Sequence, residues 1–456
     1  MPSATHHPSP AKEIWTSEEG SMARETAITR WPKIVESMVD DINETLLLAQ
    51  SGCLEGCQID EGHRIQRELQ ILKKDIIQDQ PLRCLHPDGR PDIEGFNIKL
   101  ASFGQTGTIT WQNCPWLFAE CHLYRHVHTL FSRSGSPFWR TYDIFARQKL
   151  NALVASHAAV EELCERYLSI TNSKDLTPTN TDQEVQRLLF YEMTEVALWG
   201  NATDLSLLSS TSLDQIHALQ GSKAIQAGQA RIVSNDMGAA WDHLRSNPKG
   251  RVDIVLDNAG FELFTDLVYA LYLLGAGFAS AVRLHVKSIP WFVSDVMPRD
   301  MDVLFSTLTN TALFPGANNE SVRTVAALLS AACRDGRLAV EEHPFWTTGL
   351  DFQEMPTCAP DLFETLRKES ALVILKGDLN YRKLVRDAQW SHTTPFKQAI
   401  GVLGKTGINI FALRTNKADV CVGLDEQTIQ RVEKEAPGKA WVRNGKYAVA
   451  SFSNGL

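Results

Sequence analysis

Disulfide-forming patterns are missing from this sequence. Its nine cysteines are scattered among 456 residues, without the dense, even spacing of a small secreted protein. The first segment, MPSATHHPSPAKEIW, also lacks the apolar core of a signal peptide. These two absences indicate a reducing compartment, so we expect a cytoplasmic protein, with a nuclear share left open.

Long apolar runs and clusters of positive charge are missing as well. The longest uncharged run, Leu267 to Val282, falls short of the about 18 residues of a membrane helix and contains Gly275 and Gly277. We predict a buried helix that turns into the next strand. With 45 Lys and Arg against 54 Asp and Glu, the formal net charge is −9, and no basic run would follow a phosphate backbone. We therefore expect neither a membrane nor a nucleic acid as partner, and the oligomeric state is left open.

Common nucleotide-binding and hydrolase motifs do not occur either. No G-x-G-x-x-G opens a strand–helix–strand unit, no Walker A loop is present, and no G-x-S-x-G turn would expose a serine nucleophile. A dinucleotide-binding fold, a P-loop nucleotidase and a serine hydrolase are therefore disfavoured.

The first half of the chain has a helical pattern. We expect residues 1–20 to be a disordered tail and residues 21–225 to form an all-helical N-terminal domain. One periodic segment begins at Thr29–Arg30–Trp31–Pro32 and continues through Leu48, with apolar residues three and four apart. Residues 88–113 are rich in glycine and polar groups, which predicts a long surface connection.

The second half, residues 226–456, alternates short apolar runs with helical segments. Strands that alternate with helices imply parallel pairing and a sheet covered on both faces. The fold class is therefore α/β, with a C-terminal three-layer α/β/α sheet of the doubly wound, Rossmann-like type. The candidate strands are ARIVSND, VDIVLDN, AVRLHVK, ALVILKGD and INIFALRT.

Oxygen-bearing side chains follow several of these strands directly. In VDIVLDNAGFELFTD, residues 252–266, a buried strand ends in Asp257 and Asn258, and Asp295 and Asp378 follow later strands. Ligands of parallel sheets bind beyond the carboxyl ends of the strands, where these side chains should meet. Carboxylate and amide oxygens are the ligands that magnesium and manganese prefer.

Basic side chains are predicted at the same edge of the sheet. Such groups are suited to phosphate oxygens, and acidic groups around a metal with cations nearby are what phosphoryl transfer requires. The basic residues are Lys287, Lys376, Arg382, Arg414 and Lys417.

Each of these residues also has a simpler interpretation. Asp257 could cap the following helix, Asn258 and Asp378 could be turn residues, and Asp295 could cap the segment after it. The basic residues, taken singly, could end strands with their charges in solvent. The coincidence of all of them at one edge favours a functional site.

Seven motifs together support a family resemblance. The chain resembles the damage-control phosphatase family, specifically subfamily III with its RTxK motif, which includes acidic-residue methyltransferase-like proteins, and it is identified as a fungal member. The motifs are RWP near residue 30, PWLFAECHLYR at 115–125, LWGNATDLSLL at 198–208, LDNAGFEL at 256–263, KSIPWFVSD at 287–295, KGDLNYRKL at 376–384 and RTNKAD at 414–419.

The resemblance implies a role for each motif. Asp257, Asn258 and Asp295 would bind Mn²⁺, Ni²⁺, Co²⁺ or Mg²⁺ and act as the catalytic residues. The expected substrates are sugar phosphates such as fructose 1-phosphate and fructose 6-phosphate. The implied substrate contacts are Asp378, Leu379, Asn380, Tyr381, Arg382 and Lys417.

Further residues of these motifs are candidates for the wall of the cleft. They are Glu120, Asn201 and Asp204, together with Lys287, Lys376 and Arg414. For Glu120 the favoured alternative is a buried ion pair with Arg125.

Two other functions stay open at this point. One is methyl transfer from S-adenosylmethionine to protein glutamate carboxylates, although the loop after the strand at 252–256 has only Gly260 where a glycine-rich loop is expected. The other is a non-catalytic scaffold, which would not need all three oxygen ligands. Within the hydrolase hypothesis, direct attack by water and transfer of the phosphoryl group to Asp257 are both open.

Overall fold

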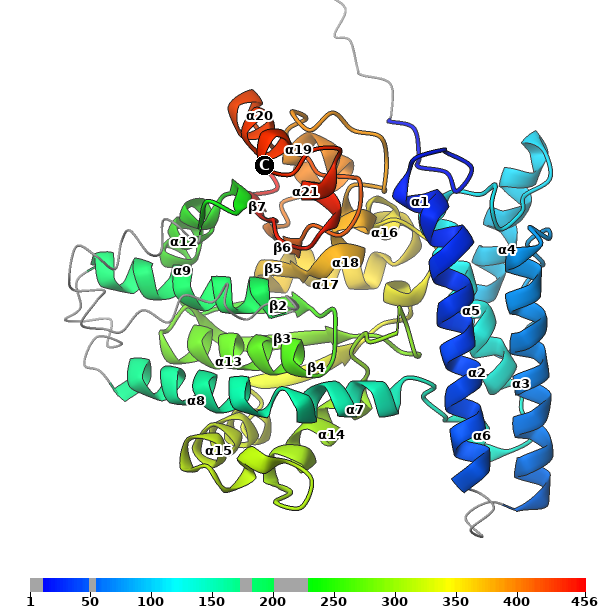
Figure 1. Ribbon diagram of the computed structural model, residues 1–456. Helices are drawn as coiled ribbons and strands as arrows, with labels where there is room; N and C mark the ends of the chain where they lie inside the picture. Colours follow the sequence, from blue (N-terminus) through cyan, green and yellow to red (C-terminus); the bar gives the residue numbers. More distant parts are fainter. Residues whose placement is uncertain (1–10, 49–54, 173–182, 201–228) are drawn as a thin grey trace, which may run out of the picture.

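The computed structural model describes residues 11–48, 55–172, 183–200 and 229–456 (Figure 1). A group of helices from the first part of the chain lies beside a layered α/β region that contains the sheet. The expected fold class, an α/β protein with an N-terminal helical part, is confirmed.

The helical part is built on two long helices, α2 (Trp31–Leu48) and α3 (Gly56–Ile77), which lie side by side (Figure 1). α2 buries Trp31, Val35, Met38, Ile42 and Leu46, whose spacing of three and four places them on one face. The helix predicted through Leu48 is thus confirmed. The helices of this part are α1 (Met22–Glu25), a π-helical turn (Thr26–Arg30), α2 (Trp31–Leu48), α3 (Gly56–Ile77), α4 (Asp92–Phe103), α5 (Trp116–Ser132) and α6 (Pro137–Arg140).

The prediction of a long surface connection over residues 88–113 is wrong in its middle. Helix α4 occupies Asp92–Phe103 and buries Ile93, Phe96 and Leu100 against α5 and its neighbours. These three residues have helical spacing, but the glycines and polar residues around them obscured that pattern.

Residues 11–20 also differ from the disordered tail predicted through residue 20. Ile14 is only 5% exposed, and its backbone N–H donates to the carbonyl of Asp387 at 3.1 Å. The N–H of Thr16 donates to the carbonyl of Cys114 at 2.9 Å. This segment therefore connects the start of α5 with a loop of the α/β region.

The sheet has seven strands in the order β1-β7-β6-β5-β2-β3-β4. All neighbouring pairs are parallel except β6 with β7, so the expectation of purely parallel pairing is wrong at that position. The strands are β1 (Ile232–Asn235), β2 (Gly250–Val255), β3 (Ala279–Val286), β4 (Leu338–Glu342), β5 (Ser370–Lys376), β6 (Ile410–Thr415) and β7 (Ala448–Ser453).

Helices cover both faces of this sheet. Along β2, Val252 and Ile254 pack in one hydrophobic cluster, whereas Val255 packs in another, as the alternation of side chains in a strand requires. The helices of the α/β region are α7 (Ala146–Ala155), α8 (His157–Asn172), α9 (Gln183–Trp199), α12 (Met237–Ser246), α13 (Phe261–Gly275), α14 (Pro298–Thr309), α15 (Glu320–Arg334), α16 (Met355–Cys358), α17 (Pro360–Glu369), α18 (Gly377–Leu384), α19 (Phe396–Ala399), α20 (Glu426–Glu435) and α21 (Ala440–Arg443).

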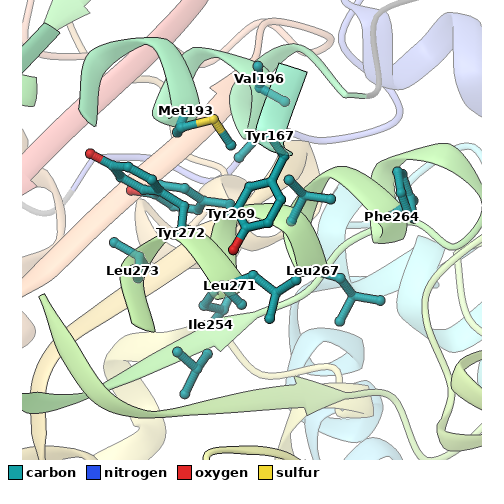
Figure 2. Packing of buried hydrophobic residues seen from close by; sticks show 14 of the residues in the cluster. Tyr167, Met193, Val196, Ile254, Phe264, Leu267, Tyr269, Leu271, Tyr272 and Leu273 are labelled. Carbon is teal, nitrogen blue, oxygen red and sulfur yellow. The ribbon is translucent and has the colours of Figure 1, made fainter. Parts of the chain in front are cut away.

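The first cluster joins helices from before residue 200 to the sheet. Figure 2 shows Tyr167 of α8 and Met193 of α9 among residues of α13, close to Ile254 of β2. Residues that the sequence analysis assigns to the helical domain thus share the core of the sheet. A domain boundary at residue 225 stays a prediction, because residues 201–228 lie outside the described part.

The longest uncharged run forms a helix and the start of a strand, as predicted. α13 ends at Gly275 and β3 begins at Ala279. α13 is buried from Phe261 to Leu273, between the sheet and α8 and α9. Within the described residues, no helix combines the length and the apolar composition needed to cross a membrane.

Candidate active site

Two loops at the carboxyl ends of β2 and β3 pair with each other and bring the predicted oxygen ligands together. Asn258 and Asp295 form an isolated antiparallel bridge. The N–H of Ala259 donates to the carbonyl of Ser294 at 2.7 Å, and the N–H of Val296 donates to the carbonyl of Asp257 at 2.9 Å. The backbone therefore fixes Asp257, Asn258 and Asp295 as neighbours.

The turn that presents Asp295 has an unusual backbone. Phe292 and Val293 have φ angles of +25° and +63°, which are costly for side chains of this size and, at Val293, for a β-branched one. Packing holds the turn in place, because the Phe292 ring stacks on Tyr124 of α5 with 4.7 Å between ring centroids. Such a conformation persists where the surrounding structure determines it, and here it directs Asp295 toward Asn258.

Asn258 is held on both sides of its amide. Its Nδ2 donates to Asp257 Oδ2 at 2.7 Å and to Glu262 Oε2 at 2.8 Å. Its Oδ1 accepts a hydrogen bond from Ser294 Oγ. The amide nitrogen therefore faces two carboxylates, and the amide oxygen faces the loop of Asp295.

Burial and neighbouring carboxylates raise the pKa values of the two aspartates. Burial raises the pKa of Asp257 well above its usual value, Glu262 and Asp295 raise it further, and Lys287 and Lys417 oppose the rise. Burial also raises the pKa of Asp295 to about 6, although Lys287 lowers it in part. Glu262 also raises the pKa of Asp295, so two buried carboxylates whose charged forms are disfavoured form a site that a cation would stabilise.

The donor set fits a hard divalent cation. Two carboxylates and one amide oxygen can ligate magnesium or manganese, while water and a substrate fill the remaining positions. Among the described residues, no group of three or more His, Cys, Asp or Glu side chains is placed to hold a metal ion. The site at the strand ends differs from such groups because its third oxygen donor is the amide of Asn258.

Gly377 is a site residue that the sequence analysis did not identify. Its φ is +86°, and a Cβ atom built on it would lie 1.9 Å from Asp257 Oδ2. Only glycine allows the backbone at the end of β5 to approach this carboxylate. The sequence signal that could have identified it is a glycine directly between a buried strand and the polar first turn of a helix.

Asp378 and Arg414 shape the loop that carries Lys417. Asp378 Oδ1 accepts from Arg414 Nε at 2.8 Å and from the backbone N–H of Lys417 at 3.2 Å. Arg414 also donates to the carbonyls of Val420 and Ala418, and its guanidinium lies 4.5 Å from the centre of the Tyr381 ring. Arg414 is therefore a buried structural cation, and Lys417 is the cation that this loop brings near Asp257.

Three residues of the 378–382 segment make internal contacts. Leu379 packs in the hydrophobic cluster of the helical part. Asn380 Nδ2 donates to the carbonyl of Lys376 at 2.7 Å and to that of Leu256 at 3.3 Å. The hydroxyl of Tyr381 accepts from the N–H of Val422 at 3.1 Å. These contacts hold α18 against the ends of β2 and β6.

Arg382 is enclosed by two carboxylates and an aromatic ring. Its Nη1 lies 2.8 Å from Glu120 Oε2, its Nη2 lies 2.7 Å from Asp387 Oδ2, and its guanidinium is 3.7 Å from the centre of the Trp116 ring. The structure thus gives Arg382 partners within the protein and places Glu120 beside it.

The favoured ion pair between Glu120 and Arg125 is wrong. Arg125 instead pairs with Asp88 at 2.8 Å and with Asp92 at 2.6 Å. Residues five apart on a helix do not share a face, so Glu120 and Arg125 point in different directions.

Lys287 and Lys376, at the ends of β3 and β5, also form ion pairs with carboxylates of the protein. Lys287 Nζ lies 3.0 Å from Asp295 Oδ2 and donates to the carbonyl of Leu256 at 2.7 Å. Lys376 Nζ lies 2.8 Å from Asp266 Oδ1 and 3.2 Å from Glu262 Oε1. The sequence analysis did not identify these two acids, although their spacing of four on α13 was a usable signal. Asn201 and Asp204 lie outside the described residues.

The fold and this site define an α/β protein with a small group of oxygen ligands at the carboxyl ends of adjacent strands. Residues 26–432 match the family model of the damage-control phosphatase ARMT1-like domain. The chain therefore belongs to the damage-control phosphatase ARMT1-like family, and the family resemblance noted from its motifs is confirmed. Membership of this family supports a phosphatase acting on small phosphorylated molecules.

Individual relatives match over nearly the whole chain. The sequence is 34% identical over 464 residues to damage-control phosphatase ARMT1 of Danio rerio, covering 98% of this chain and 97% of the relative. It is 32% identical over 460 residues to ARMT1 of Mus musculus, covering 96% of this chain and 98% of the relative. A solved DUF89 family protein from Pyrococcus horikoshii aligns with a TM-score of 0.38 and 13% identity, over 92% of this chain and 98% of that one.

Proposed function

We propose that the protein is a divalent-metal-dependent phosphatase that hydrolyses sugar phosphates, of the fructose 1-phosphate and fructose 6-phosphate class, in metabolite damage control. The observation that carries this proposal is the paired loops after β2 and β3, which bring two buried carboxylates and an amide together. Family membership supports the phosphatase, and the oxygen ligands support the metal.

Asp257, Asn258 and Asp295 would hold the metal ion, which could be Mn²⁺, Ni²⁺, Co²⁺ or Mg²⁺. Once bound, such an ion withdraws charge from a phosphate oxygen. Lys287 holds Asp295 in place, and Ser294 orients the oxygen of Asn258. The chain thus supplies the ligands already oriented, which reduces the cost of arranging them on binding.

The substrate would lie between these ligands and the loop after β6. Lys417 brings a positive charge that already acts on Asp257, and it would neutralise phosphate oxygens. Within residues 378–382, Asp378 has a side chain that is 19% exposed, whereas the other four residues are buried. We therefore assign contact with a sugar hydroxyl to Asp378, and to Arg382 the positioning of α18.

The direct test is phosphate release from a panel of sugar phosphates, with each divalent ion in turn, by the wild type and by Asp257→Ala. We expect metal-stimulated release by the wild type and background release by the variant, since one of three oxygen ligands is gone. Asp361→Ala removes an exposed carboxylate after β4 and serves as the control that keeps activity.

Metal-stimulated hydrolysis by a folded Asp257→Ala protein would overturn the assignment. If Asp257 only capped a helix, its loss would cost about 1 kcal/mol of stability and spare the activity. Calorimetric titration with S-adenosylmethionine separates the rival enzyme class, for which we expect no binding.

A further inference from the structure

Glu262, in the first turn of α13, lies behind Asn258 on the side away from Ser294. We propose that Glu262 is a positioning residue that fixes which atom of the Asn258 amide faces the metal ion. This inference rests on the proposed function, because it concerns the same ion. The sequence analysis points to Asp257, Asn258 and Asp295, and it assigns nothing to Glu262.

The argument begins with the two different ends of an amide. The nitrogen of Asn258 can only donate hydrogen bonds, and a metal ion can be bound only by its oxygen. Glu262 Oε2 accepts from Nδ2 at 2.8 Å, and Asp257 Oδ2 accepts from the same nitrogen at 2.7 Å. Both hydrogens of the amide are thereby used, so a half-turn of the side chain would bring its oxygen against two carboxylates.

Asp257 alone would be a weak orienting group, because it is itself a proposed ligand of the ion. Glu262 does not belong to either of the paired loops that carry the ligands, since it lies on α13. It can therefore hold Nδ2 while the oxygen of Asp257 is engaged elsewhere. Such outer partners of metal ligands are known to set ligand orientation.

Glu262 is in turn held in place by a buried lysine. Lys376 Nζ lies 3.2 Å from Glu262 Oε1 and 2.8 Å from Asp266 Oδ1, and it donates to the carbonyl of Ala197. The side chains of Glu262 and Lys376 are 4% and 1% exposed. A buried carboxylate with a fixed partner has little freedom, so its second oxygen stays directed at Asn258.

A purely structural role predicts a different outcome in a matched pair of variants. Glu262 and Asp266 lie one turn apart on α13, and both are counter-ions of Lys376, but the described contacts of Asn258 include Glu262 and not Asp266. Glu262→Gln and Asp266→Asn each remove one negative charge beside the same lysine. If Glu262 serves only as a counter-ion, the two variants should behave alike toward metal.

The experiment is calorimetric titration of the full-length protein with Mn²⁺. We expect Glu262→Gln to weaken Mn²⁺ binding by about 10- to 100-fold, the usual range for an outer partner of a metal ligand, and Asp266→Asn to leave it within about threefold of the wild type. Thermal unfolding of both variants reports folding separately. Unchanged Mn²⁺ affinity in Glu262→Gln, or equal weakening in both variants, would overturn the inference.

Glu262→Asp provides a second test should the Gln variant fold poorly. It keeps the charge beside Lys376 but shortens the side chain by one methylene, so it should lose contact with Nδ2 and weaken Mn²⁺ binding at least about tenfold. Wild-type affinity in this variant would contradict a positioning role. Failure of the wild type to bind Mn²⁺ would instead contradict the proposed function itself, so the two failures are distinguishable.

Discussion

Gly377 lies where the end of β5 passes the carboxylate of Asp257. Its φ of +86° is unfavourable for other residues, and the space that a side chain would need is occupied by Asp257 Oδ2. A residue at this position must adopt a positive φ, and it must leave room for the carboxylate of Asp257. A substitution there tests both the geometry of the site and its link to metal binding.

We predict that Gly377→Ala displaces Asp257 and removes most of the Mn²⁺ affinity, besides destabilising the fold. Gly407→Ala is the matched control, because Gly407 has a similar φ of +80° but a Cβ atom added there would meet nothing within 4 Å. The control should cost only the backbone penalty, about 1–2 kcal/mol, and keep Mn²⁺ binding. Calorimetric titration and urea unfolding measure the two effects, and equal behaviour of both variants would contradict the close approach to Asp257.

Single residues also show where sequence reasoning succeeds. Asp257, Asn258 and Asp295 could be grouped from the sequence because each follows a strand of one sheet, and the structure brings them together. The ion pairs of Arg382 with Glu120 and of Lys376 with Asp266 could not be predicted, because the partners lie far apart along the chain. The spacing of Glu262 and Asp266 indicates that they share one face of α13, but not which cation meets that face.

At the scale of elements, Arg125 connects α5 to the segment that leads into α4. Its guanidinium donates to Asp92 through Nε and Nη2 and to Asp88 through Nη1 and Nη2, and the side chains of Arg125 and Asp88 are fully buried. Burial alone would raise the pKa of Asp88, but the Arg125 guanidinium outweighs burial and holds the pKa at about 2, below the usual 3.8.

The lowered pKa predicts how stability depends on pH. As the pH falls, the Asp88 carboxylate takes up its proton at a higher pH in the unfolded chain than in the folded protein. The ion pair therefore contributes stability above about pH 4, and this contribution is lost as the pH falls toward 2. Asp88→Asn lacks this titration. The difference in free energy of unfolding between the wild type and Asp88→Asn should therefore shrink between about pH 6 and about pH 2.5 in urea titrations. A difference that stays constant over this range would contradict the assigned ion pair.

Elements also differ in how well the sequence predicts them. Strands β1, β2, β3, β5 and β6 are short apolar runs, and the pattern identified all five. β4, at the edge of the sheet, reads LAVEE, and its two glutamates obscure the apolar run. β7 reads AVASFS, in which two serines and two alanines weaken the apolar run, although helices α20 and α21 precede it as the alternation requires.

At the scale of the whole molecule, the site is shared by the helical part and the sheet. The hydrophobic cluster of the N-terminal helices includes residues from three segments that shape the site. They are Ile289 and Trp291 before Asp295, Leu379 of α18 and Ala418 after Lys417. The helical part therefore supports the segments that carry the ligands.

Two halves with different patterns were evident from the sequence, but their contact was not. The surfaces that meet combine residues near 14, 116, 291 and 379, and hydrophobic periodicity shows only that each helix has a buried face. Which faces meet depends on contacts between segments far apart along the chain. Physical reasoning from one sequence can therefore propose the site at the strand ends but not the helices that enclose it.

The central claim is that one divalent cation binds between the two paired loops. Anomalous diffraction from crystals of the full-length protein soaked in Mn²⁺ tests this most directly. The account predicts a manganese peak within about 2–2.6 Å of oxygen atoms from Asp257, Asn258 and Asp295. A map with manganese bound elsewhere, and none at these three side chains, would contradict it.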